Sequence, residues 1–221
     1  MIFSKPHNEL SEREVLDRAL KAIWDPFLRS HGFQGSGRKF KRITETAVHF
    51  VSVDGFWCGG IFAINLDCYW RAVPPVWGEK PTSVGRITST KSQFSCRLIS
   101  PEDERAGRCD HHWKMTCDQR TVVREVHNVC ETLTNWGFCW LQVSCQPAEV
   151  LRTWEAGGGD ALLVRYGTGR GYPVLIAHAL VETGQFAKAL PLVNEFLTQE
   201  DPSIFSQEYL EFARSLRDLC N

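Results

Sequence analysis

The chain has 221 residues, of which 43% are hydrophobic and 23% are charged, and its formal net charge is −1. Such a composition is typical of a globular protein and excludes wholesale disorder. Because the net charge is close to zero, no overall field attracts nucleic acid or an anionic membrane, and we expect neither as a partner.

The first predicted element is a helix that begins after Ser11. Ser11 and Glu14 have the spacing of a capping box, and apolar residues then recur at intervals of three or four as far as Leu28. Gly32 is suited to the left-handed conformation that ends many helices, and Phe33 is placed to fold back on the helix. We therefore predict one helix that ends at Gly32.

The residues between Arg38 and Trp70 predict strands, because the apolar period changes to two. Turn signals at Asp54-Gly55 and Gly59-Gly60 separate the second of these strands from the third. Two further short strands are expected later in the chain, in Gln93–Ile99 and His112–Thr116. Five strands in consecutive order predict an antiparallel sheet, and we expect the first helix to pack on one of its faces.

Helical periodicity returns at Asp118, the predicted N-cap of a helix that ends at Gly137. The remaining predicted helices run from Pro147 to Gly157-Gly158-Gly159, Pro173–Glu182, Phe186–Leu197 and Pro202–Leu219. The pair separated by Gly184 faintly resembles a tetratricopeptide hairpin, although a solenoid of such repeats needs about three. We therefore predict an α+β fold, with an α+β domain over residues 1–140 and a helical cap or subdomain over residues 141–221.

The nine cysteines are irregularly spaced, and several lie where a small buried hydrophobic residue would lie, among them Cys68, Cys96 and Cys130. Met1 to Leu10 carry no secretory apolar stretch, and no apolar run approaches the roughly 20 residues needed to cross a bilayer. We therefore expect a cytoplasmic protein with reduced thiols.

Five segments carry a likeness to a known family: LDRALKAIWDPFLRSHGF, GRKFKR, GIFAINLDC, SCRLIS and HHWKMT. Together they resemble the bacterial domain-of-unknown-function family 4304, over roughly Leu16 to Trp140. The long insertion after Trp70 and the expanded helical tail depart from that family. Such domains occur among bacterial polymorphic-toxin systems, in which small cytosolic proteins act as immunity factors. The resemblance implies this role for the chain and brings no established active site.

The nearest approach to a metal cluster is formed by Cys109, Asp110, His111, His112 and Cys117. A closed zinc site needs four ligands, and two adjacent histidines on a strand point to opposite sides. At most one histidine could therefore join the two cysteines. We expect a loop that enters a strand, and no metal or other cofactor.

The motif Gly167-x-Gly169-x-Gly171 looks like a phosphate-binding loop. It lacks the Lys-Ser/Thr pair of a P-loop, and its spacing differs from that of a dinucleotide fingerprint. We interpret it as a turn between two helices.

Two stretches outside the predicted elements, Arg71–Ser92 and Ser100–Cys109, are candidates for recognising a partner protein. Trp77 lies in the first stretch, where it either anchors a partner or folds back to pin its own loop. The second stretch carries three consecutive acidic residues, which we expect to form a solvated charge run that can meet a basic surface. The predicted partner-binding residues are Arg71, Trp77, Arg86, Glu102, Asp103 and Glu104.

Two classes of function remain open for this sequence. The first is a non-catalytic protein-binding module, in the form of an immunity protein that neutralises a bacterial toxin. The alternative is a small-ligand-binding protein or a hydrolase-like enzyme that uses the groove between helix and sheet, with Cys117, His111 or His112. We favour binding, because every catalytic constellation lacks a geometric or chemical requirement. The sequence predicts neither the identity of the partner nor the oligomeric state.

Overall fold

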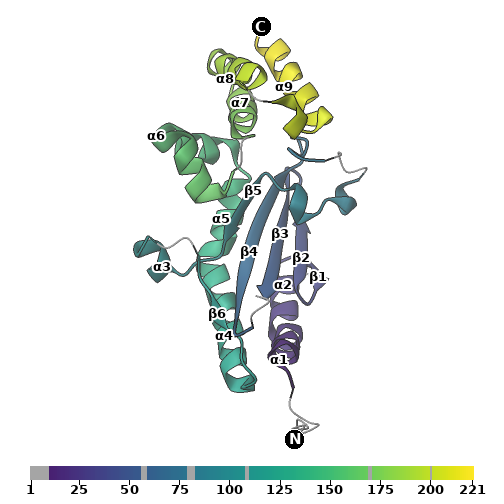
Figure 1. The fold of residues 1–221 in the computed structure, drawn as a ribbon, viewed down its shortest axis with the longest axis vertical. Helices are drawn as coiled ribbons and strands as arrows, with labels where there is room; N and C mark the ends of the chain where they lie inside the picture. Colours follow the sequence, from purple (N-terminus) through teal and green to yellow (C-terminus); the bar gives the residue numbers. More distant parts are fainter. Residues whose placement is uncertain (1–9, 56–58, 79–82, 108–109, 169–170, 200) are drawn as a thin grey trace, which may run out of the picture. The chain divides into compact units, whose positions relative to one another are not determined.

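The fold is α+β, as predicted, with helices at both ends of the chain and an antiparallel sheet between them (Figure 1). A computed structural model of the protein describes residues 10–55, 59–78, 83–107, 110–168, 171–199 and 201–221. Within these ranges, no helix combines the length and the apolar character that a membrane crossing requires.

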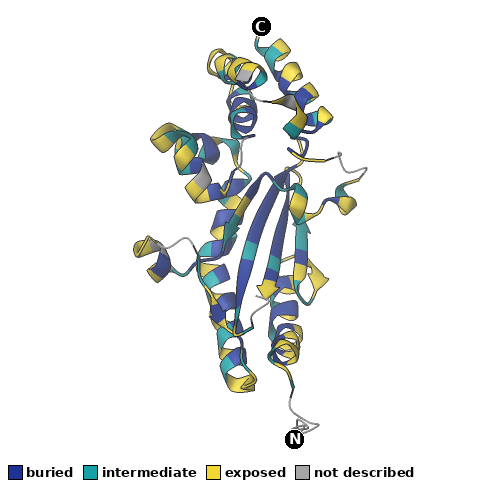
Figure 2. Cartoon of the chain, in the orientation of Figure 1, coloured by how far each residue is buried: buried dark blue, intermediate teal, exposed yellow. Residues whose placement is uncertain are grey.

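The sheet has the strand order β1-β2-β3-β4-β5, and a short strand β6 also pairs with β4. The five predicted strands are confirmed, but their consecutive order is wrong for the last one, since β6 pairs with β4 rather than with β5. The one additional strand among the described residues is β1, which pairs with β2 through Gly35 opposite Phe40. The long strands β3 and β4 are buried along most of their length (Figure 2). The strands are β1 Gln34–Ser36, β2 Lys39–Ile43, β3 Ala47–Gly55, β4 Ile61–Trp70, β5 Phe94–Arg97 and β6 Trp113–Lys114.

The first helical segment comprises α1 Glu12–Ala19, a π-helical turn Leu20–Trp24 and α2 Asp25–Ser30. The predicted capping box is confirmed: the Ser11 hydroxyl accepts the Glu14 N–H, and the Glu14 carboxylate accepts the Ser11 N–H. The predicted stop is also confirmed, because Gly32 has a φ of +80° and the Phe33 N–H donates to the Leu28 carbonyl.

The helix α4, Gln119–Thr132, begins at the predicted N-cap, since the Asp118 carboxylate accepts the N–H groups of Arg120 and Thr121. The predicted end at Gly137 is wrong. A π-helical turn over Leu133–Gly137 leads directly into α5, Phe138–Ser144. The reason is burial: Gly137 itself is buried inside the turn, and apolar residues continue beyond it, so packing outweighs the weak helix propensity of glycine.

The chain divides into two compact units. The first unit comprises the described residues within Met1–Arg42, Val51–Asn65 and Arg97–Gly137, and in it α1 contacts α4. The second comprises those within Ile43–Phe50, Leu66–Cys96 and Phe138–Asn221. The strands β3 and β4 contribute residues to both units, and the domain boundary near residue 140 stays a prediction.

The helices of the second unit follow the predicted series closely. They are α6 Pro147–Tyr166, α7 Tyr172–Glu182, α8 Phe186–Gln199 and α9 Gln207–Cys220. The predicted end of α6 at Gly157-Gly158-Gly159 is wrong, because the helix is kinked at Gly157 and Gly158 but continues to Tyr166. Gly184 separates α7 from α8, as expected, with a φ of +75°. The last helix starts at Gln207 rather than at Pro202, because the Ser206 hydroxyl caps it by accepting the Tyr209 N–H.

The predicted loops contain short helical pieces. In the described part of Arg71–Ser92 these are the 3-10 turns Val84–Arg86 and Ser89–Lys91. The stretch after Ser100 was expected to be irregular but forms the short helix α3, Pro101–Arg105. Its first turn is stabilised by the Ser100 hydroxyl, which accepts the Asp103 N–H at 3.1 Å.

The buried amide of Gln93 holds the end of β4 in the second unit. Its Oε1 accepts the backbone N–H of Trp70 at 2.7 Å, and its Nε2 donates to the Val73 carbonyl at 3.0 Å. The Trp70 indole N–H in turn donates to the Ser144 carbonyl at 2.8 Å. These bonds satisfy buried polar groups where the chain leaves the sheet, so they fix the path of the following loop.

His178 makes the stability of the second unit depend on pH. The residue is 7% exposed, and its ring contacts those of Trp70 and Phe212, with centroids at 5.9 and 5.6 Å. Burial lowers the pKa of His178, and the charge of Glu182 opposes this shift in part. The folded chain therefore resists protonation of this imidazole more than the unfolded chain does.

We predict that the free energy of unfolding is unaffected by the titration of His178 above the ordinary histidine pKa of about 6.5. As the pH falls below that value, the unfolded chain binds a proton at His178 more readily than the folded chain, so the free energy of unfolding decreases. The loss is at most about 1.4 kcal/mol per pH unit, down to the lowered pKa of the folded state. Urea unfolding at neutral and mildly acidic pH should show a smaller pH dependence for His178→Phe than for the wild type. His127→Phe, at an exposed position on α4, is the control. Equal pH dependence of the wild type and His178→Phe would contradict the prediction.

Candidate functional site

The predicted partner-binding residues lie on two different units. Arg71, Trp77 and Arg86 belong to the second unit, whereas Glu102 and Asp103 belong to the first. The side chain of Glu104 lies outside the described part of the structure. Each unit therefore presents a candidate surface of its own.

The surface of the first unit is an acidic cleft of about 570 Å³. Asp103 contributes to it but is only 5% exposed, because its carboxylate contacts the His111 ring nitrogen Nδ1 and accepts the Ser100 hydroxyl at 2.8 Å. The expectation of a solvated charge run is therefore wrong for Asp103, which the helix α3 turns inward. The cleft is lined by Ser100, Glu102, Asp103, His111, Trp113, Glu125, Asn128, Glu131, Thr132 and Asn135.

The charge of this cleft suits a cationic group. Its described lining has carboxylates from α3 and α4 and includes no Lys or Arg. Two carboxylates are offset in part by neighbouring cations, since Glu102 pairs with Arg105 at 3.2 Å and Glu125 lies 3.8 Å from Arg124. The Glu102–Arg105 pair is exposed on both sides, so it is weak and exchanges readily with a partner's side chain.

The cysteine–histidine cluster predicted near β6 does not converge in the structure. His112 lies 3.1 Å from Asp110, while His111 contacts Asp103, and neither His112 nor Cys117 lines the cleft. Cys109 lies outside the described residues. Among the residues that the structure describes, no three His, Cys, Asp or Glu side chains are gathered as a metal ion would require.

The thiols in the interior are poorly suited to nucleophilic chemistry. Cys68 and Cys130 are buried, as predicted, and burial raises the pKa of both, to about 12 for Cys130. Cys96, which we also expected to be buried, is only partly buried, and this burial still raises the pKa of its thiol. A raised pKa keeps a cysteine in the unreactive thiol form at neutral pH.

The surface of the second unit carries Trp77, which is 47% exposed. Its ring stacks on that of Phe205, with centroids 5.5 Å apart and an angle of 9° between the planes. The backbone beside it is fixed as well, because Ser206 donates its N–H to the Val76 carbonyl and its hydroxyl to the Pro75 carbonyl. Trp77 thus packs against a distant segment rather than its own loop, and it keeps nearly half of its surface open.

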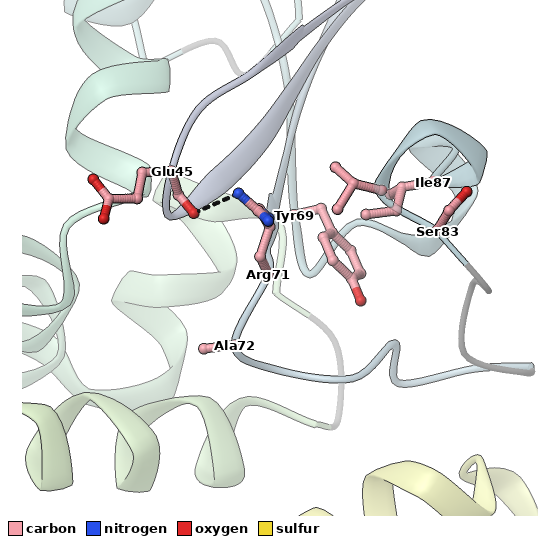
Figure 3. Close-up of a pocket in the computed structure, with 7 residues that line it drawn as sticks. Glu45, Tyr69, Arg71, Ala72, Ser83 and Ile87 are labelled. Atoms are coloured by element: carbon pink, nitrogen blue, oxygen red, sulfur yellow. Dashed lines mark hydrogen bonds between the residues drawn. The ribbon is translucent and has the colours of Figure 1, made fainter.

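A pocket of about 350 Å³ lies near the start of the same loop (Figure 3). The guanidinium of Arg71 donates from Nη1 to the backbone carbonyls of Thr44 at 2.9 Å and Glu45 at 2.7 Å. Arg86 is exposed at the end of an adjoining 3-10 turn. The pocket is lined by Glu45, Tyr69, Arg71, Ala72, Ser83, Val84 and Ile87.

The comparisons with known proteins gave a single result. No family model, no curated protein and no solved structure matches this chain. Membership of the domain-of-unknown-function family 4304 stays a prediction, and function has to be argued from the geometry of the two surfaces.

The features that sequence reasoning missed are long-range partners. Phe205 and Ser206, which hold Trp77 in place, lie at the start of the last helix and carry no local mark of that role. The contact between His111 and Asp103 joins two stretches that we treated separately. Nothing in the sequence around Trp77 or Ser206 indicates that these two distant segments lie together.

The glycine-rich motif before α7 serves close packing, in agreement with its interpretation as a turn. Gly167 has a φ of +59°, and a Cβ built on it would lie 2.0 Å from the Ser95 carbonyl oxygen. A Cβ on Gly171 would lie 2.8 Å from the Tyr209 hydroxyl, which donates to the Gly171 carbonyl. Gly169 lies outside the described residues. Position 167 therefore requires glycine for two reasons, its positive φ and the closeness of the Ser95 carbonyl oxygen.

We predict that Gly167→Ala destabilises the protein by about 3 kcal/mol or more, because the added methyl group collides with a backbone oxygen that cannot move alone. Gly184→Ala is the matched control: Gly184 has a φ of +75°, and no described atom lies within 4 Å of a Cβ built there. Its cost should be only about 1–2 kcal/mol, the usual penalty of a left-handed residue. Urea unfolding of both variants measures the difference, and equal losses of stability would contradict this account of Gly167.

Proposed function

We propose that the chain is a non-catalytic protein-binding module that uses Trp77 as its anchor. The observation that carries the proposal is the position of this side chain, which is about half exposed and yet stacked on Phe205. An exposed tryptophan gains most when a partner covers it, and tryptophan is enriched among the residues that dominate binding energy.

The support beneath Trp77 lowers the cost of binding. Phe205 is buried and packs in turn against Phe196 and Tyr209, at centroid distances of 4.9 and 6.0 Å. The two hydrogen bonds from Ser206 fix the backbone on the N-terminal side of Trp77. Because the ring is already ordered, little conformational entropy is lost when a partner docks.

Charged groups on each unit can add specificity to the contacts that this unit makes with a partner. Arg71 and Arg86 lie in the same loop region as Trp77 and offer guanidinium donors. The acidic cleft of the first unit offers carboxylates, among them Glu102 and Glu131, to a basic partner. Complementary charges steer encounter and select partners more than they add affinity.

The resemblance to the family of toxin-system domains supports a more specific form of the proposal, in which the chain is an immunity protein. An inhibitor of this kind needs a rigid surface and no activated group, which agrees with the high pKa of the buried thiols. The acidic cleft would suit the basic active-site surface of a nuclease toxin.

The test uses the product of the reading frame next to the gene as the partner. Trp77→Ala should weaken binding in calorimetry by at least about 2 kcal/mol, the size expected for an anchor residue. Phe186→Ala is the control, because Phe186 is 41% exposed on α8 and has no role in the proposed surface. Circular dichroism checks that both variants fold. Unchanged affinity of Trp77→Ala for a partner that the wild type binds would remove Trp77 as the anchor.

A second candidate function, hydrolysis in the acidic cleft, is favoured by one observation. The Asp103 carboxylate contacts His111 Nδ1, which is the arrangement that orients a histidine as a general base. If this function holds, turnover of activated ester or phosphodiester substrates should be lost in His111→Ala and kept in His112→Ala. Equal activity of the two variants would exclude His111 as the base.

A further inference from the structure

The strongest unassigned feature of the molecule is the hydroxyl of Tyr69. The residue is 2% exposed, and its ring packs with Val48, Phe50 and Ile87. Its hydroxyl has no hydrogen-bond partner among the described residues, and Figure 3 shows the ring between Arg71 and Ile87, which line the same pocket. Burial raises the pKa of this phenol, so at neutral pH it is a donor. Tyr69 lines the pocket, so a ligand that enters the pocket can accept a hydrogen bond from this hydroxyl.

Arg71 supplies a fixed positive charge to the same pocket. Its Nη1 is held by the carbonyls of Thr44 and Glu45, so the plane of the guanidinium is set before any ligand arrives. The other guanidinium nitrogens have no acceptor among the described residues. In Figure 3 the Glu45 carboxylate points away from Tyr69, and only its backbone carbonyl meets Arg71. The positive charge therefore remains available on the pocket side.

The opposite wall is mostly apolar. Ile87 is buried and Val84 packs against the same cluster, while Ser83 adds one hydroxyl at the edge (Figure 3). The volume of about 350 Å³ lies at the lower end of the range for small-molecule sites. One cation, one phenol hydroxyl that faces the pocket and an apolar wall match a ligand with one negative charge and a short apolar body.

We propose that this pocket binds a small monocarboxylic acid. Its carboxylate accepts hydrogen bonds from Arg71 and the Tyr69 hydroxyl, and its apolar body packs on Val84 and Ile87. A phosphate dianion is less well matched, because Arg71 is the only cation among the lining residues that the structure describes. This site shares Arg71 with the proposed partner-binding surface but does not include Trp77, so the binding of hexanoate and the effect of Trp77→Ala on partner binding can fail independently.

Hexanoate is the probe for this site, with hexan-1-ol and hexylamine as matched controls. In a titration of the full chain followed by amide NMR, hexanoate should shift residues 69–72 and 83–87 in a saturable manner. A ligand of this size is expected to bind with a Kd on the order of 1 mM. The absence of saturable shifts at these residues, or equal binding of hexan-1-ol, would overturn the proposal.

Two variants test the proposed contacts, and Tyr69→Phe leaves the structural bonds of Arg71 in place. Tyr69→Phe keeps the packed ring and should weaken hexanoate binding about five- to tenfold, the effect of one hydrogen bond to a charged group. Arg71→Lys should weaken binding by about tenfold or more, because one ammonium cannot replace the oriented guanidinium. Arg152→Lys, at an exposed position on α6, is the control and should change nothing. Wild-type affinity in Tyr69→Phe would overturn the assignment of this hydroxyl.

Discussion

The second unit depends on the hydrogen bonds through which Gln93 holds the end of β4. One buried amide accepts the Trp70 N–H and donates to the Val73 carbonyl, so the chain turns out of the sheet with its polar groups satisfied. The Trp70 side chain continues the network to the Ser144 carbonyl at the end of α5. Both candidate features of this unit, the Tyr69–Arg71 pocket and Trp77, lie within a few residues of this point. The Gln93 amide therefore fixes the backbone from which the pocket and Trp77 are positioned, although it is part of neither.

The local elements of the fold could be predicted because their signals are local. Ser11, Gly32 and Asp118 act within three or four residues of their own positions, and each does in the structure what its spacing indicates. Gly137 was a misleading signal because tertiary packing, rather than local sequence, decides its conformation. It is buried and followed by apolar residues, so the helix continues through it, whereas an exposed glycine would end the helix. Periodicity in one stretch carries no information on what the rest of the chain packs against that stretch.

The candidate sites were predicted only in part, for the same reason. The sequence identified Trp77, Arg71 and Asp103 as polar or aromatic residues in loops, which is a compositional signal. It could not reveal that Phe205 lies under Trp77, or that His111 turns Asp103 inward, because these contacts join distant segments. The Tyr69 hydroxyl was missed altogether, since alternation in a strand marks its ring as core and does not show that its oxygen borders a pocket.

The hydroxyl of Ser206 has two partners, and this has a consequence for how the loop and the last helix move. It donates to the Pro75 carbonyl and accepts the Tyr209 N–H. One oxygen atom therefore both holds the loop in place and caps the N-terminus of α9. Fraying of the first turn of α9 would release the backbone beside Trp77 at the same moment. Loops of this length ordinarily open on their own. Because of the shared hydroxyl, we expect the loop that carries Trp77 and the first turn of α9 to open together, so that their amide protons exchange with solvent at a common rate.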